Sequence, residues 1–241
     1  MTFETYWNEV RKCDEVKNSE DLLHKLAVHL DVGTTKHSKR TAMGVAMVTY
    51  AASIEHDIAV PLIAGAQVHD LGKHACQDII LASFVDYTQP FNAYMQRRHP
   101  HDGFELVKRQ LPRTAYSDLA AAHVLTHHTH KNAEESNYPT PAILKLYTDI
   151  GDATKRQINV TRISGPILAH NDLMDAMTHP QERPYMADDE RLKALSYAEL
   201  VDNAVFVAER DLKTMPFGIT PHQIGTLLLA YHPLADAYSA Q

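Results

Sequence analysis

Apolar residues recur at helical spacing along most of this chain of 241 residues, and that pattern limits its fold more than any other feature. Residues 3–17, 19–33 and 34–55 each carry apolar side chains three or four positions apart, which is the period of one helix face. Alternating strand patterns and Asn-Gly hairpin turns are absent from the sequence. The sequence therefore predicts an all-α protein.

Prolines and capping residues indicate where the helices begin and end. Ser19 precedes an apolar run and is the predicted N-cap of the helix over 19–33. Pro100 is expected to open a helix that closes at Pro112. No internal repeat or low-complexity linker divides the chain, so we expect a single domain. Further helices are expected over 117–130, 143–153, 163–177, 190–212 and 221–231.

Composition argues against several classes of protein. The formal net charge of -7 disfavours binding to nucleic-acid polymers and to anionic membranes. No apolar run reaches the length of a membrane span, and the N-terminus lacks the apolar region of a signal peptide. Cys13 and Cys76 are too few for a disulfide framework. We expect a protein of the reducing cytoplasm.

The stretch VHDLGK over residues 68–73 holds an adjacent histidine and aspartate, His69 and Asp70. Imidazole and carboxylate groups are good ligands for divalent metals, and one carboxylate can bridge two ions through its two oxygens. Lys73 lies about one helical turn after Asp70 and can face the same point, where it could meet a bound anion. One such pair can arise by chance in a chain with 16 histidines. It indicates a metal site only if other residues of the chain supply further ligands.

Further candidate ligands come from separate predicted helices, each near a helix end or a proline: His37, His99 and the pair His127-His128. Taken singly, His37 is more often a helix cap or a surface residue, and His99 is similar. The histidines at 123, 127, 128 and 130 could form a solvated polar face. Taken together, the imidazoles and carboxylates suit a dinuclear centre of iron or manganese, with zinc or nickel as alternatives.

The order of these residues resembles the HD metal-dependent phosphohydrolase superfamily, in particular its HD-GYP branch of cyclic di-GMP phosphodiesterases. The sequence HSKR at 37–40 is similar to that branch's opening motif, a histidine followed three residues later by an arginine. VHDLGK resembles the HD-x-GK core, and HPHDG at 99–103 resembles the HP-x-x-G segment at a helix start. His127-His128 matches the paired histidines.

The family's last aspartate has two candidates in this chain. Asp149 and Asp152 form one Asp-x-x-Asp-Ala sequence, and Asp172 and Asp175 form another. We favour Asp172 because Arg-Pro-Tyr, which follows in the family, occurs only after it, at 183–185. The resemblance covers about residues 34–186, which implies an HD-type helical bundle with extra helices over 1–33 and 187–241.

This resemblance implies a role for each candidate residue. One metal ion would be held by His37, His69, Asp70 and Asp172, and the second by Asp70, His99, His127 and His128. Asp70 would thus bridge the two ions, and Asp175 would support them from outside. Lys73 would hold a substrate phosphate. Arg183 is either a second phosphate contact or part of a structural ion pair.

Two departures from the family pattern concern the substrate loop and a third metal. Thr129 stands where the family has an acid after the paired histidines, and the loop ends in Asn-Tyr-Pro at 137–139, without the glycine of Gly-Tyr-Pro. Gly33 occupies the position of the glutamate that binds a third metal in some members, so we expect two ions.

The implied activity is hydrolysis of a small anionic phosphoester, a cyclic dinucleotide such as cyclic di-GMP, by a metal-bridging hydroxide. Two alternatives remain. The HD scaffold also hosts di-iron oxygenases, and the altered loop fits a catalytically degenerate domain that binds a nucleotide or a partner protein. The two N-terminal helices cover the core or form a homodimer contact.

Overall fold

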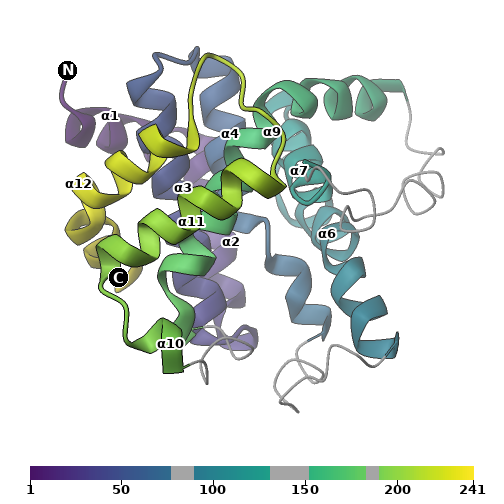
Figure 1. The fold of residues 1–241 in the computed structure, drawn as a ribbon. Helices are drawn as coiled ribbons and strands as arrows, with labels where there is room; N and C mark the ends of the chain where they lie inside the picture. The colour runs from purple at the N-terminus through teal and green to yellow at the C-terminus, as the bar shows by residue number, and fades with distance from the viewer. Residues whose placement is uncertain (77–89, 131–151, 183–189) are drawn as a thin grey trace.

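The computed structural model describes residues 1–76, 90–130, 152–182 and 190–241 (Figure 1). Within these ranges the regular structure is helical and contains no β-strand, which confirms the all-α prediction. The longer helices are α1 (Phe3–Val10), α2 (Asp14–Leu26), α3 (Val32–Ala51), α4 (His56–Val68), α6 (Pro90–Gln110), α7 (Ala115–Thr126), α9 (Asp152–Thr178), α11 (Tyr197–Asp211) and α12 (Pro221–Ser239). Shorter pieces are η1 (Ala27–His29), η2 (Leu71–Cys76), η4 (Pro180–Glu182) and α10 (Glu190–Lys193). No helix in the described ranges is both long and apolar enough to cross a membrane.

Several predicted helix boundaries were wrong. The helical structure is interrupted at residues 11–13, so α2 begins at Asp14. Ser19 therefore lies inside this helix and not at its start. The Ser19 hydroxyl is buried and donates to the carbonyl of Glu15 at 2.8 Å. Pro100 lies inside α6 and does not open a new helix. The predicted helix over 190–212 is divided into α10 and α11.

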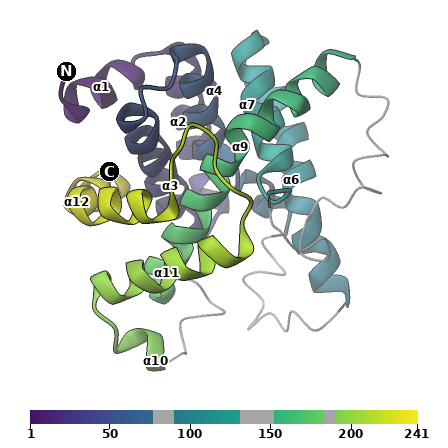
Figure 2. The same cartoon turned by 45° about the horizontal axis from the view of Figure 1, so that its top comes forward.

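Helix α3 runs through the centre of the molecule and is buried on all sides from His37 to Thr49. Its N-cap is Asp31, whose carboxylate accepts the backbone N–H of Thr34 at 2.8 Å. α3 packs against α4, α9 and α12, and Figure 2 shows it between these helices. Small residues such as Ala42 and Gly44 allow these neighbours to approach closely.

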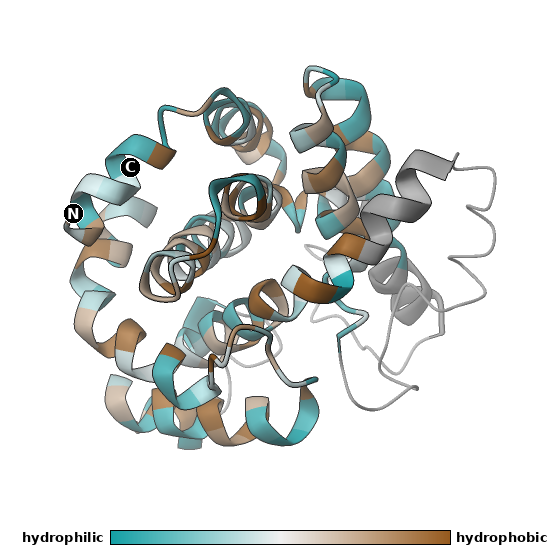
Figure 3. Ribbon diagram, turned by 90° about the horizontal axis from the view of Figure 1, so that it is seen from above, coloured by the Kyte–Doolittle hydropathy of each residue, from teal (hydrophilic) through white to brown (hydrophobic). Residues whose placement is uncertain are grey.

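The apolar core consists of two clusters of buried side chains. The first is built mainly from α1, α3, α4, α9, α11 and α12, with Val16 of α2 and Ala120 of α7, and the second is built mainly from α2, η2, α6 and α7. α4 connects them, because Ala66 belongs to the first cluster and Val68 to the second. Hydrophobic and hydrophilic residues are interleaved along the helices in Figure 3. The His-Asp pair thus follows α4 at the point where it reaches the second cluster.

Gly72 lets η2 lie directly against α6. A Cβ atom at Gly72 would stand 1.8 Å from the backbone oxygen of His99 and 2.5 Å from the backbone nitrogen of Gly103. Neither atom can rotate away as a side chain could, so the segment after Asp70 approaches α6 only because residue 72 is glycine.

We expect Gly72→Ala to lower the free energy of unfolding by about 3 kcal/mol or more, because the added methyl group forces two backbone segments apart. Gly103→Ala is the matched control from the other side of the contact. Its Cβ would lie 2.9 Å from a side-chain methyl of Val124 and 3.1 Å from the backbone nitrogen of Gly72, a milder approach than 1.8 Å, and alanine gains helix propensity, so this variant should cost less. Urea denaturation measures both variants, and equal losses would contradict the assigned contact.

Candidate metal centre

Five helices bring the predicted ligands together near the middle of the bundle. His37 lies in the second turn of α3, His99 lies within α6, and Asp172 lies within α9. His69 and His127 are the C-cap residues of α4 and α7, so Asp70 and His128 follow directly after these two helices. Figure 2 shows α9 running between α3 and α7, both of which it contacts.

The first part of the cluster surrounds the Nε2 atom of His37. This atom lies 2.9 Å from Oδ1 of Asp172 and 3.2 Å from Nε2 of His69. Nε2 of His69 lies 3.5 Å from the same Asp172 oxygen. Both imidazoles are buried, and the Asp172 side chain is 18% exposed. Distances of this size match the separations between ligand atoms that each lie about 2 Å from one metal ion.

Asp70 lies between this group and a second one. Its Oδ2 is 3.7 Å from Nε2 of His37 and 3.6 Å from Nε2 of His69. Its Oδ1 is 3.3 Å from Nε2 of His99. The Lys73 ammonium contacts Oδ2 closely. The two oxygens of one buried carboxylate therefore face two different sets of imidazoles.

The second part of the cluster consists of three histidines. Nε2 of His99 and Nε2 of His127 lie 3.2 Å apart. The half-buried ring of His128 lies 4.0 Å from the ring of His127 and 5.2 Å from that of His99, measured between centroids. One ligand atom from each of the three lies within 4.8 Å of the others. The groups His37, His69, Asp70 and His69, His127, Asp172 meet the same criterion, so the structure holds buried His/Asp groups that could bind metal ions.

Hydrogen bonds at Nδ1 orient the rings of three histidines so that their Nε2 atoms face the cluster. Nδ1–H of His69 donates to the Ala66 carbonyl at 2.8 Å, and Nδ1–H of His127 donates to the Val124 carbonyl at 2.6 Å. Nδ1–H of His37 donates to the Asp175 carboxylate at 2.7 Å. A neutral ring with its proton on Nδ1 presents an unprotonated Nε2, whereas the 2.9 Å hydrogen bond from Nε2 of His37 to Asp172 needs a second proton on that ring. Buried lone pairs 3.2 Å apart repel each other unless a proton or cation lies between them, and this donor set fits a divalent metal.

The two acids at the centre are held in their charged forms. Burial alone would raise the pKa of the Asp70 carboxyl, but Lys73, His69 and His99 together hold that pKa well below its usual range. Burial likewise opposes ionisation of Asp172, and its hydrogen bonds with His37 and His69 hold its pKa well below the usual range. Both carboxylates are therefore ionised at neutral pH and available to cations.

A second layer of polar residues fixes the orientation of His37. The Asp175 carboxylate that accepts from His37 also accepts from the Arg40 guanidinium, at 2.7 Å and 3.2 Å. Arg40 donates in addition to Glu182 at 2.6 Å. Sequence reasoning placed Asp175 outside the ligand set but missed the contribution of Glu182. Spacing could have linked Arg40 and Asp175, because each lies one turn after a predicted ligand on its own helix.

Some predicted residues have different surroundings from those expected, and others lie outside the described part of the chain. The solvated face proposed for the histidines at 123, 127, 128 and 130 is wrong, because His123, His127 and His130 are buried. Thr129 donates from its hydroxyl to the Thr126 carbonyl at 2.8 Å. Arg183, Asp149 and the Asn-Tyr-Pro sequence at 137–139 lie outside the described residues.

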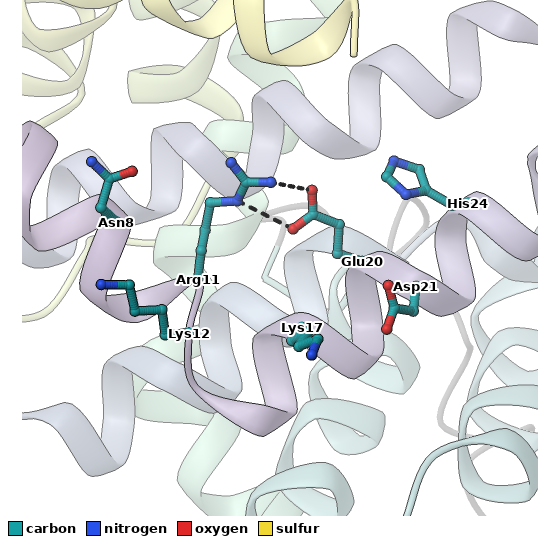
Figure 4. Close-up of a pocket in the computed structure, with 7 residues that line it drawn as sticks. All are labelled: Asn8, Arg11, Lys12, Lys17, Glu20, Asp21 and His24. Atoms are coloured by element: carbon teal, nitrogen blue, oxygen red, sulfur yellow. Dashed lines mark hydrogen bonds and ion pairs between the residues drawn. The ribbon is translucent and has the colours of Figure 1, made fainter.

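An open hollow of about 540 Å³ lies elsewhere, at α1 and α2 (Figure 4). Arg11 and Glu20 form a bidentate ion pair in it, with N–H···O distances of 2.6 Å and 3.2 Å. The Arg11 guanidinium also lies 4.9 Å from the centre of the Tyr238 ring. These contacts tie the N-terminal helices to α12. The hollow is lined by Asn8, Arg11, Lys12, Lys17, Glu20, Asp21 and His24, none of which belongs to the metal centre.

Comparison of this chain with protein-family models, with curated proteins and with solved structures gives no match in any of the three. The interpretation of the centre therefore rests on its own residues and their geometry.

Two buried histidines near the centre make the fold sensitive to acid. Burial lowers the pKa of His123 from 6.5 to about 3, and burial with help from Lys213 and His170 lowers that of His130 to about 3. Between pH 6.5 and 3 the unfolded chain binds protons at these sites and the folded chain does not. Stability is therefore unaffected by these groups above pH 6.5 and falls as the pH falls below it.

We expect His123→Gln, which keeps a hydrogen-bonding group for the Ser164 hydroxyl, to flatten this dependence by about 1.4 kcal/mol per pH unit. Urea unfolding between pH 5.5 and 4.5, with a chelator present, measures the slope. His222→Gln alters an exposed histidine and should leave the slope unchanged. Parallel slopes for His123→Gln and the wild type would refute the assignment.

Proposed function

We propose that this protein is a phosphohydrolase of the HD superfamily that uses two divalent metal ions to cleave a phosphodiester bond. One observation carries the proposal. The two oxygens of the buried Asp70 carboxylate face separate sets of imidazoles, with Oδ1 at His99 and Oδ2 at His37 and His69. A single metal ion needs only one of these sets, whereas a bridging carboxylate between two ions needs both.

The ligand sets of the proposal follow the two halves of the cluster. The first ion would be held by His37, His69, Asp70 and Asp172. The second would be held by Asp70, His99, His127 and His128. Imidazole-rich sites with carboxylates favour iron or manganese here, and zinc or nickel also accept such ligands. Bound divalent cations would supply Lewis acidity and would activate a water molecule at neutral pH.

The chain's own residues prepare the centre for this chemistry. Backbone carbonyls and Asp175 hold the Nδ1 protons of three histidines, so Nε2 is the atom that each ring could offer as a ligand. Lys73 is half-buried, and its ammonium lies on the Asp70 carboxylate. Cations held at Asp70 would balance the charge of its carboxylate, and the Lys73 ammonium would then be available to a non-bridging phosphate oxygen. Arg183 is proposed as a second contact to the phosphate.

A cyclic dinucleotide such as cyclic di-GMP is the proposed substrate class. Its support is the order of the motifs, in which the paired histidines and the later Arg-Pro-Tyr favour a hydrolase of the HD-GYP type over an HD-type oxygenase. A phosphodiester anion also suits the positive charge that bound metal ions and Lys73 would present.

The test is metal analysis of the purified protein combined with turnover of a panel of cyclic and linear dinucleotides and a model phosphodiester. We expect about two ions per chain at the centre and hydrolysis of at least one diester. A metal-replete protein that cleaves no phosphoester would overturn the proposal. Oxygen consumption with reduced iron would then indicate an oxygenase, and nucleotide binding without turnover would indicate a degenerate binding domain.

Asp70→Ala should lose both ions at the centre and lower the diesterase rate at least ~100-fold, since one variant removes a ligand from each ion. Asp102→Asn is the control, because Asp102 is a half-buried carboxylate on α6 that pairs with Arg98 and His101. It should keep the metal content and rate of the wild type. Retention of both ions by Asp70→Ala would refute the bridging role.

A further inference from the structure

We infer that the protein has a separate binding site for a divalent transition-metal ion of the Zn²⁺ class, formed by His179, His232 and Asp236. This site shares no ligand with the centre at Asp70 and does not depend on the proposed hydrolase activity. His179 follows directly after α9, and the other two residues lie on α12. One ligand atom from each lies within 4.8 Å of the others.

The Nε2 atom of His179 is the first observation that indicates a ligand. It is buried and has no hydrogen-bond partner among the described residues. Its ring orientation is fixed from the other side, because Nδ1 lies 3.3 Å from Oδ1 of Asp175 and 3.1 Å from the Thr178 hydroxyl. A buried imidazole nitrogen without a partner is costly unless something binds it. A carboxylate on Nδ1 with a free Nε2 is the usual support of a metal-binding histidine.

The spacing of the other two residues is the second observation. His232 and Asp236 lie four residues apart on α12, so they occupy the same helix face one turn apart. Nε2 of His232 is 3.4 Å from Oδ2 of Asp236, and Nε2 of His179 is 3.6 Å from Oδ1. A tetrahedral zinc ion with ligand bonds of about 2 Å separates its ligand atoms by about 3.3 Å.

The rings around the site hold its histidines in place. The His179 and His232 rings are nearly parallel, at 5° with centroids 5.9 Å apart. The Tyr197 ring packs on His232 with centroids 3.7 Å apart. His232 is therefore held by neighbouring rings although its side chain is only partly buried.

Charge and exposure both suit a cation from solution. The carboxylates of Asp175 and Asp236 flank His179, and the nearby Arg40 guanidinium is already paired with Asp175 and Glu182. The side chains of His232 and Asp236 are 28% and 46% exposed. A bound ion would thus complete its coordination with water, which leaves a position open to solvent.

The test is equilibrium dialysis against low-micromolar Zn²⁺, followed by metal analysis of the full chain. His232→Ala and Asp236→Asn should each bind one equivalent fewer than the wild type. Both change a partly exposed side chain, and circular dichroism checks that the fold is kept. His222→Ala, an exposed histidine near the start of the same helix, should bind as many equivalents as the wild type.

Equal metal content in the wild type and both variants would overturn the inference, as would an equal loss in the His222→Ala control. Because the result is a difference between variants, it does not depend on how many ions the centre at Asp70 binds. Failure of that centre would lower all four proteins alike, whereas failure of this site would remove only the difference between them.

Discussion

The Asp175 carboxylate is the interaction on which the arrangement of the polar interior depends. It is buried in α9, accepts hydrogen bonds from Arg40 and His37 on α3, and lies 3.3 Å from Nδ1 of His179. Burial would raise its pKa, but Arg40, His179 and His37 hold that pKa well below the usual range. Removing one partner from a buried charge network of this kind costs about 3–5 kcal/mol. The contact therefore fixes α3 against α9 as well as orienting two imidazoles.

Two helix ends contribute to the candidate metal centre, and they help to explain how its polar groups can be buried together. His69 and His127 cap α4 and α7, where the last backbone carbonyls have no partner within the helix. Their Nδ1–H groups donate hydrogen bonds to carbonyls of the preceding turn, those of Ala66 and Val124. One hydrogen bond thus satisfies a helix end and prepares a ligand.

Some candidate ligands are recognisable in the sequence because they are adjacent, whereas Asp172 was chosen through the family resemblance. His69-Asp70 and His127-His128 are adjacent pairs, and the one-turn spacing between Asp172 and Asp175 survives in any helix. The all-α fold followed from helical periodicity. Helix boundaries were less predictable, because packing decides them. Ser19 was expected to cap a helix, yet burial and a bond to the Glu15 carbonyl place it inside α2.

The site at His179 could not be predicted from the sequence, because its ligands are brought together only by the packing of α12 near the end of α9. The spacing of His232 and Asp236 is common on solvated helix faces, and His179 lies 53 residues earlier than His232. His179 also shares a carboxylate with His37. Asp175 faces Nδ1 of His179 with Oδ1 and Nδ1 of His37 with Oδ2. A cation on Nε2 of His179 would strengthen the pull of that ring on Oδ1, and the same carboxylate supports His37. The Asp175 carboxylate therefore supports His37 and His179 at the same time, through its two separate oxygens.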